Sequence, residues 1–197
     1  MQQSRLWKPS SSSYGVIMAL PSTIYRVTIQ LSDIDRGVYE TLQATVARHP
    51  SETEERLVAR LLAYTLFYEE QLLFTKGVSA GDEPDLWAKG ADGRVLLWVE
   101  VGLPEAERVI KASRHAARVI LIAGGKALSS WEQQQLPKLE GVPNLAVISF
   151  DPAFINSLVT KLDRSIQWSI TITDGNLYLN VGNETYETII QERVGSR

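Results

Sequence analysis

The chain has 197 residues, enough for one domain with a sizeable hydrophobic core. It has no cysteine and only two histidines, which excludes disulfides, cysteine nucleophiles, thiolate metal sites and multi-histidine zinc sites. The net charge of −3 gives no overall attraction to nucleic acid, and no apolar run approaches the roughly 20 residues that span a membrane. We expect a cytoplasmic protein, in which any metal site would use carboxylates and hold Mg²⁺ or Mn²⁺.

The N-terminal segment differs in composition from the rest of the chain. Pro9 is followed by four consecutive serines, and the basic start is not followed by the apolar core of a secretory signal. Met18 begins a second, more natural start. We expect residues 1–17 to be a disordered extension or tag, and residues 18–197 to form a single domain.

The first half of the chain predicts a hairpin and a long helix. Thr23–Ser32 alternates apolar and polar residues, and Val38–Ala47 continues the alternation after a turn, so the two read as antiparallel strands. Ser51 is the expected helix N-cap, with Glu54 completing a capping box. The apolar spacing predicts that this helix continues to about Phe74.

The second half predicts a mixed sheet with crossover helices. Two short strands, 84–89 and 94–101, flank a turn, and strands and helices then alternate to residue 162, which predicts parallel pairing through right-handed crossovers. Ile166–Ile172 and Leu177–Val181 read as a closing hairpin. The expected class is α+β, with a central mixed β-sheet flanked by helices and hairpins at both ends of the domain.

Two acids at the ends of the short strands are the main candidates for chemistry. If opposed residue numbers in this antiparallel pair sum to 185, Asp85 faces Glu100, with Cβ atoms roughly 5 Å apart. If the numbers sum to 183, Asp85 and Glu100 are diagonal neighbours on one face of the sheet. If the sum is even, the two acids lie on opposite faces and cannot share a metal ion. Glu100 follows the apolar run Leu96–Val99, where an unpaired charge is costly. A bound cation would relieve that cost, and so would an arginine.

Charged residues on two predicted helices are the further candidates. On the first helix, Glu52 lies at the positive helix start, where an acid is stabilising, and Glu55 is the candidate for a third metal-binding acid. Arg56 and Arg60 either pair with these acids or contact phosphate. The helix after Pro104 carries a basic stripe that is either a solvated face or a phosphate-tracking surface. Its members are Arg108, Lys111, Arg114 and Arg118, of which Lys111 could swing toward Glu100.

Several strings of residues resemble the YaeQ family of bacterial proteins. The resemblance extends from about Met18 to Val181, nearly the whole predicted domain. The matching strings are Met18-Ala19-Leu20, Ala47-Arg48-His49-Pro50-Ser51-Glu52-Thr53, Glu55-Arg56, Arg60-Leu61-Leu62, Phe74-Thr75-Lys76-Gly77, Asp82-Glu83-Pro84, Leu97-Trp98, Glu100, Gly102, Pro104, Lys111-Ala112 and Asp174-Gly175.

The resemblance implies a variant of the restriction-endonuclease-like PD-(D/E)XK nuclease fold. In such nucleases, acids on a helix and on two strands bind Mg²⁺, and a lysine orients the attacking water. By motif position, Asp85 and Glu100 match the strand acids and Glu55 matches the helix acid. Gly102 departs from the pattern, which has lysine there, and Lys111 is the expected substitute.

Two function hypotheses follow. The first is a phosphodiesterase dependent on Mg²⁺ or Mn²⁺ that acts on nucleic acid, with the metal on Asp85, Glu100 and Glu55 and with Lys111 placing the water. In that hypothesis Arg56, Arg60 and Arg108 bind phosphates. The second is a non-catalytic module that binds nucleic acid or protein and has a degenerate nuclease site, which Gly102 and the acidic pI of about 5.5 favour. Under either hypothesis we expect a monomer with no membrane partner.

Overall fold

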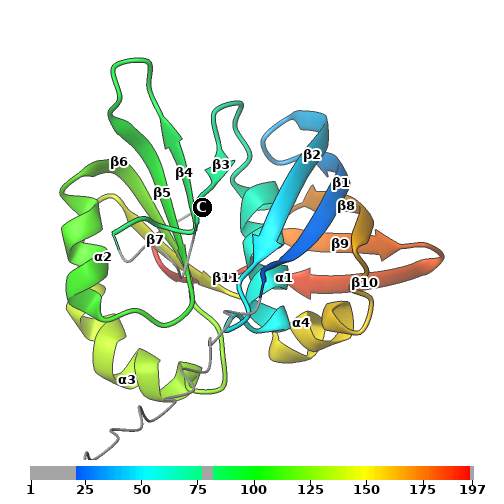
Figure 1. The fold of residues 1–197 in the computed structure, drawn as a ribbon. Helices are drawn as coiled ribbons and strands as arrows, with labels where there is room; N and C mark the ends of the chain where they lie inside the picture. The colour runs from blue at the N-terminus through cyan, green and yellow to red at the C-terminus, as the bar shows by residue number, and fades with distance from the viewer. Residues whose placement is uncertain (1–20, 77–81, 196–197) are drawn as a thin grey trace, which may run out of the picture.

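The computed structural model describes residues 21–76 and 82–195, which form two mixed β-sheets and four helices (Figure 1). The expected α+β class is confirmed, but the expectation of one central sheet is wrong. The terminal hairpins do not flank a central sheet, because they pair with each other and make a sheet of their own. The extension expected at residues 1–17 lies outside the described residues.

The first sheet has the strand order β10-β9-β8-β1-β2. Strands β1 and β2 form the predicted antiparallel hairpin, and β8 pairs with β1 in parallel and with β9 in the predicted closing hairpin. Alternate residues of β1 are buried, so this sheet has one buried face and one face toward solvent. The bounds are β1 Thr23–Asp33, β2 Val38–Arg48, β8 Ser165–Thr173, β9 Asn176–Val181 and β10 Glu184–Ile189.

The second sheet has the strand order β11-β7-β6-β5-β4-β3. Its central strands β5, β6 and β7 are parallel, as predicted, because a helix connects each one to the next. Strand β7 is buried along its whole length, as expected of a strand covered on both faces. The bounds are β3 Leu73–Phe74, β4 Leu86–Lys89, β5 Val95–Val101, β6 Ala116–Ile122, β7 Leu145–Ser149 and β11 Gln191–Val194.

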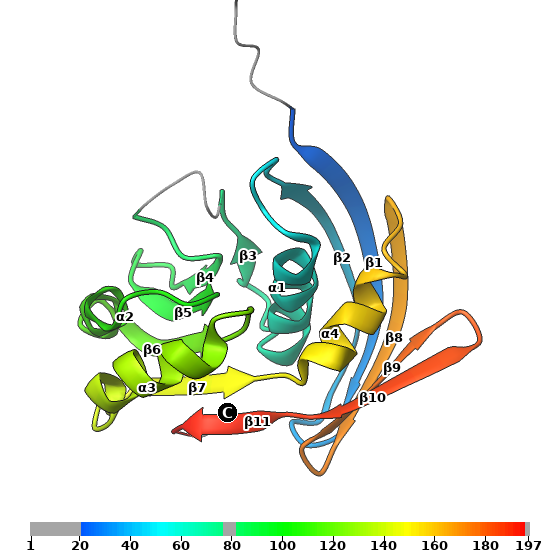
Figure 2. The same ribbon diagram turned by 90° about the horizontal axis from the view of Figure 1, so that it is seen from below.

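The helices form two groups. Helix α1 lies between the two sheets beside α4, whereas α2 and α3 cover the far face of the second sheet (Figure 2). The larger core cluster therefore joins both sheets to α1 and α4, and a smaller one lies under α2 and α3. The bounds are α1 Glu54–Leu66, α2 Ala106–Ser113, α3 Leu128–Leu139 and α4 Pro152–Val159.

Helix α1 differs from its prediction at both ends. Its N-cap is Thr53, whose hydroxyl accepts a bond from the Arg56 backbone N–H at 3.3 Å, while the Ser51 hydroxyl lies 2.7 Å from the His49 ring. The helix ends at Leu66 rather than near residue 74. Leu72 is buried, but it lies in a turn after the helix. Its spacing from the apolar residues of α1 therefore predicted a helix that is too long. No helix within residues 21–76 and 82–195 is long and apolar enough to cross a membrane.

Candidate functional site

The register of β4 and β5 changes at Asp85. Leu86 pairs with Val99 and Trp87 with Trp98, so the numbers of opposed residues sum to 185. Asp85 lies just outside these pairs, and its backbone N–H donates to the Val99 carbonyl at 2.9 Å. The numbers 85 and 99 sum to 184, so the register of 185 does not continue to Asp85 and Glu100. Both acids lie near the C-terminal end of β5, but Asp85 faces α1 and Glu100 faces α2, as expected of an even sum.

Asp85 is buried, and its carboxylate is fully engaged. Its side chain is 1% exposed, and Nη2 of Arg56 donates to both oxygens, at 2.7 and 2.8 Å. The Val101 backbone N–H donates to Oδ2 at 2.8 Å, and Arg60 Nε lies 3.5 Å from Oδ1. Burial raises the pKa of Asp85 by more than Arg56, Arg60 and the Val101 N–H lower it. The carboxylate thus remains in the protein interior through direct contacts with these donors.

Glu52 completes a second ion pair with the same arginines. Arg56 and Arg60 each donate to Glu52 at 3.1 Å, and both Glu52 and Arg60 are buried. We call Glu52, Arg56, Arg60 and Asp85 the buried ion cluster. It ties the N-terminal end of α1 to the edge of the second sheet. The sequence left open whether Arg56 and Arg60 pair with the acids of this helix or contact phosphate, and the structure pairs both arginines with Glu52.

Glu100 is held separately, from the other side of the second sheet. Arg108 of α2 donates to it through Nε at 2.9 Å and Nη2 at 3.2 Å, and the Trp98 indole donates at 3.1 Å. Burial raises the pKa of Glu100, the Arg108 contact lowers it, and the charge of Asp85 raises it further. The two acids therefore influence each other electrostatically, yet each is neutralised by a different helix.

The other two predicted site residues lie apart from these contacts. Glu55 is exposed on α1, whereas the adjacent Arg56 turns toward Asp85. Lys111 is exposed on α2, one turn beyond Arg108. Arg108 makes the contact with Glu100 that the sequence led us to expect of Lys111.

Gly102 adopts a backbone conformation that side chains resist. Its φ is +121°, a value that L-residues rarely adopt, and its N–H donates to the Ile122 carbonyl at 2.9 Å. A Cβ at this position would lie 4.0 Å from Arg56 Nε. The position at which the nuclease pattern has lysine therefore faces an arginine from α1, on a backbone that favours glycine.

The residues present do not fit a bound Mg²⁺ as they are arranged. Within the described parts of the chain, no group of three or more His, Cys, Asp or Glu side chains could hold a metal ion. Mg²⁺ prefers six oxygen ligands and usually keeps several waters, but the Asp85 oxygens are enclosed by nitrogen donors. The three carboxylates are matched by three guanidiniums, so the six side chains together carry no net charge.

Comparison with known proteins identifies the family. A family profile described as YaeQ protein matches residues 18–190. Two relatives, each named "Uncharacterized protein YaeQ", are 38% identical to this chain. The one from Salmonella typhi aligns over 171 residues, which cover 86% of this chain and 94% of the relative. The one from Escherichia coli K12 aligns over 164 residues, which cover 83% of this chain and 91% of the relative.

Solved structures agree with this. The crystal structure of YaeQ from Pseudomonas syringae superimposes with a TM-score of 0.85 at 40% identity, covering 89% of this chain and 97% of that one. The YaeQ structure from Xanthomonas axonopodis pv. citri gives a TM-score of 0.85 at 34% identity, covering 89% and 99%. The chain belongs to the YaeQ family.

Proposed function

We propose that this YaeQ-family chain is a non-catalytic binding or regulatory module whose core derives from a PD-(D/E)XK nuclease. The observation that carries the proposal is the pairing of both strand acids with arginines. Asp85 accepts two bonds from Arg56, and Glu100 accepts two from Arg108. Gly102, where the nuclease pattern has lysine, supports the same conclusion through its positive φ.

The energetics of the buried ion cluster favour this proposal over metal catalysis. A cation on Asp85 would have to displace the Arg56 guanidinium from both oxygens. Breaking a buried ion pair costs about 3–5 kcal/mol, because it leaves a charge without its partner. Asp85 is 1% exposed, so a hydrated ion has no room there without further rearrangement. The cluster is therefore better suited to fixing α1 on the second sheet than to binding a metal.

A protein partner suits the charges better than nucleic acid does. The three arginines once expected to bind phosphate are paired with carboxylates, and Arg60 is also buried. Phosphate binding depends on cations that can neutralise the backbone charge. A chain with a net charge of −3 and a neutral cluster offers little of that attraction.

The second candidate remains a metal-dependent phosphodiesterase, and one observation favours it. Asp85 and Glu100 lie near the same end of β5, and the charge of Asp85 raises the pKa of Glu100. Arg56 and Arg108 are 21% and 33% exposed, so both can turn toward solvent, whereas Arg60 cannot. Metal-dependent cleavage requires Arg56 to leave Asp85 and Arg108 to leave Glu100.

A cleavage assay separates the two functions. Wild type, Glu100→Ala and the control Glu107→Ala, which changes an exposed acid on α2, are incubated with single- and double-stranded DNA and RNA, with Mg²⁺ or Mn²⁺. We expect no metal-dependent cleavage by any of the three. Cleavage by wild type and Glu107→Ala that is lost in Glu100→Ala would contradict the proposal.

A further inference from the structure

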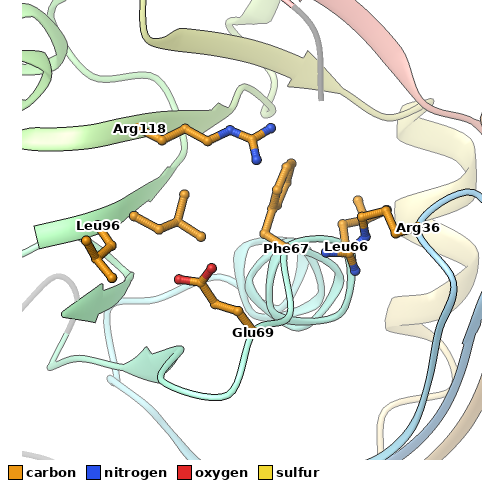
Figure 3. A pocket seen from close by; sticks show the side chains of 7 residues that line it. Arg36, Leu66, Phe67, Glu69, Leu96 and Arg118 are labelled. Atoms are coloured by element: carbon orange, nitrogen blue, oxygen red, sulfur yellow. The ribbon is translucent and has the colours of Figure 1, made fainter. Parts of the chain in front are cut away.

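A second feature of the molecule lies at the opposite end of α1 from the buried ion cluster. A pocket of about 140 Å³ opens between the C-terminal end of α1 and the starts of β5 and β6 (Figure 3). Leu96, in its wall, lies four residues before Glu100 on β5, or roughly 13 Å at about 3.3 Å per residue. The pocket is therefore separate from the carboxylate site.

Glu69 gives the pocket an acidic wall. Its Oε1 is shielded from solvent and has no hydrogen-bond partner among the described residues. A buried acceptor without a partner is costly, and the cost is larger for a charged group. Glu69 also follows the C-terminal end of α1, where the helix dipole is negative and the last turn carries no basic residue. This wall favours a cationic group.

Arg118 supplies a basic wall. It extends from β6, and its guanidinium lies 5.8 Å from the centre of the Phe67 ring. No ion pair found within residues 21–76 and 82–195 includes it. The other cation of the wall, Arg36, is already bound to Asp33 at 2.6 Å and to the Tyr68 carbonyl at 3.2 Å. Arg118 is therefore the cation that remains for an anionic group.

Apolar side chains line the space between these walls. Phe67 and Leu97 are buried in the core, whereas Leu96 is 42% exposed, a high value for a large aliphatic side chain. Figure 3 shows Glu69 and Arg118 extending toward the pocket from the segment after α1 and from β6. A cavity of about 150 Å³ holds benzene, so this one admits a body of about six heavy atoms.

We propose that this pocket binds a small zwitterion of the α-amino-acid type. The ammonium group pairs with Glu69, the carboxylate pairs with Arg118, and a short apolar body packs against Phe67 and Leu96. Each charge of the ligand thereby meets a side chain that lacks an ion-pair partner among the described residues. A ligand with only one of the two charges leaves the opposite wall unmatched.

The test uses L-valine as the probe, with isobutylamine and isovalerate as matched compounds that lack the carboxylate and the amine, respectively. Binding is followed by ¹⁵N–¹H NMR titration of the full-length protein. We expect saturable shifts with L-valine at the amides of Phe67 and Leu97. Because hydrogen bonds to charged groups contribute about 1.5–3 kcal/mol, each single-charge compound should bind at least about tenfold more weakly.

Variants with controls locate the site. Glu69→Gln and Arg118→Gln should each weaken L-valine binding at least about tenfold, while the exposed neighbours Glu70→Gln and Arg114→Gln should leave it unchanged. The proposal is overturned if L-valine causes no saturable shift in the wild type, or if the shifts persist in Glu69→Gln. It is equally overturned if a double-mutant cycle shows that Glu69 and Arg118 pair with each other while L-valine does not bind.

Discussion

Replacing Arg60 with methionine tests the buried ion cluster most severely. Arg60 is 2% exposed, and its Nη1 lies 3.1 Å from each oxygen of Glu52. Its Nε lies 3.5 Å from Asp85, and its guanidinium lies 5.4 Å from the centre of the Phe74 ring. Methionine retains most of the apolar stem but removes the charge. The cluster then holds two carboxylates and one guanidinium.

The expected loss of stability follows from that imbalance. Removing one partner of a buried ion pair costs about 3–5 kcal/mol, because the other charge is left without compensation. We expect a value near the lower end, about 3 kcal/mol, since Arg56 still contacts both carboxylates. For a domain of this size that corresponds to a fall in Tm of about 6–12 °C.

The loss should also depend on pH, with a definite sign. Burial already raises the pKa of Asp85, and Arg60 is one of the groups that lower it, so the variant raises it further. Between the ordinary pKa and this higher one, the folded state binds more protons than the unfolded state. Stability therefore falls as pH rises through that window. The deficit of Arg60→Met should be larger at about pH 7 than at about pH 5.

Urea denaturation at both pH values measures this, with Arg94→Gln as the control. Arg94 is paired with Asp92 at 3.2 Å, but both side chains are largely exposed, so its loss should change stability by less than about 0.5 kcal/mol. A loss below about 1 kcal/mol for Arg60→Met would refute the reasoning. An equal loss at the two pH values would refute the charge argument.

Three further predictions concern the backbone, the helix cap and Glu100. Gly102→Ala should destabilise by about 1–3 kcal/mol in thermal denaturation because of its φ of +121°, while Gly124→Ala, which has open space and no positive φ, should be nearly neutral. Thr53→Ala should cost about 1 kcal/mol and Ser51→Ala less than about 0.5, since Thr53 caps α1; equal losses would contradict that cap. Burial raises the pKa of Glu100, so the stability of the wild type should fall as pH rises above the ordinary glutamate range. Glu100→Gln should remove this fall, which urea denaturation at several pH values measures.

The strand pairing could be predicted where the local pattern is strong. The alternation along β1 and β2 predicts one hairpin, and the two short strands Ile166–Ile172 and Leu177–Val181 predict the other. The parallel order of β5, β6 and β7 follows from their intervening helices. In each case the determining residues are close in sequence.

Features that depend on distant contacts could not be predicted. The parallel pairing of β1 with β8 makes the first sheet separate from the second, and it joins segments more than a hundred residues apart. Strand β10 has a largely exposed, polar pattern, so it gives no clear apolar alternation. The partners of the acids were also underdetermined, because Arg56, Arg108 and Lys111 all had sufficient reach, and only packing selects among them.

Arginines pair with both candidate carboxylates, Asp85 and Glu100, and we propose that they stand in place of a metal. Calorimetric titration of Mn²⁺ into wild type and Glu100→Ala tests it directly. The arginine contacts of Asp85 and Glu100 predict no saturable binding in either protein. Saturable Mn²⁺ binding to the wild type that is lost in Glu100→Ala would contradict it.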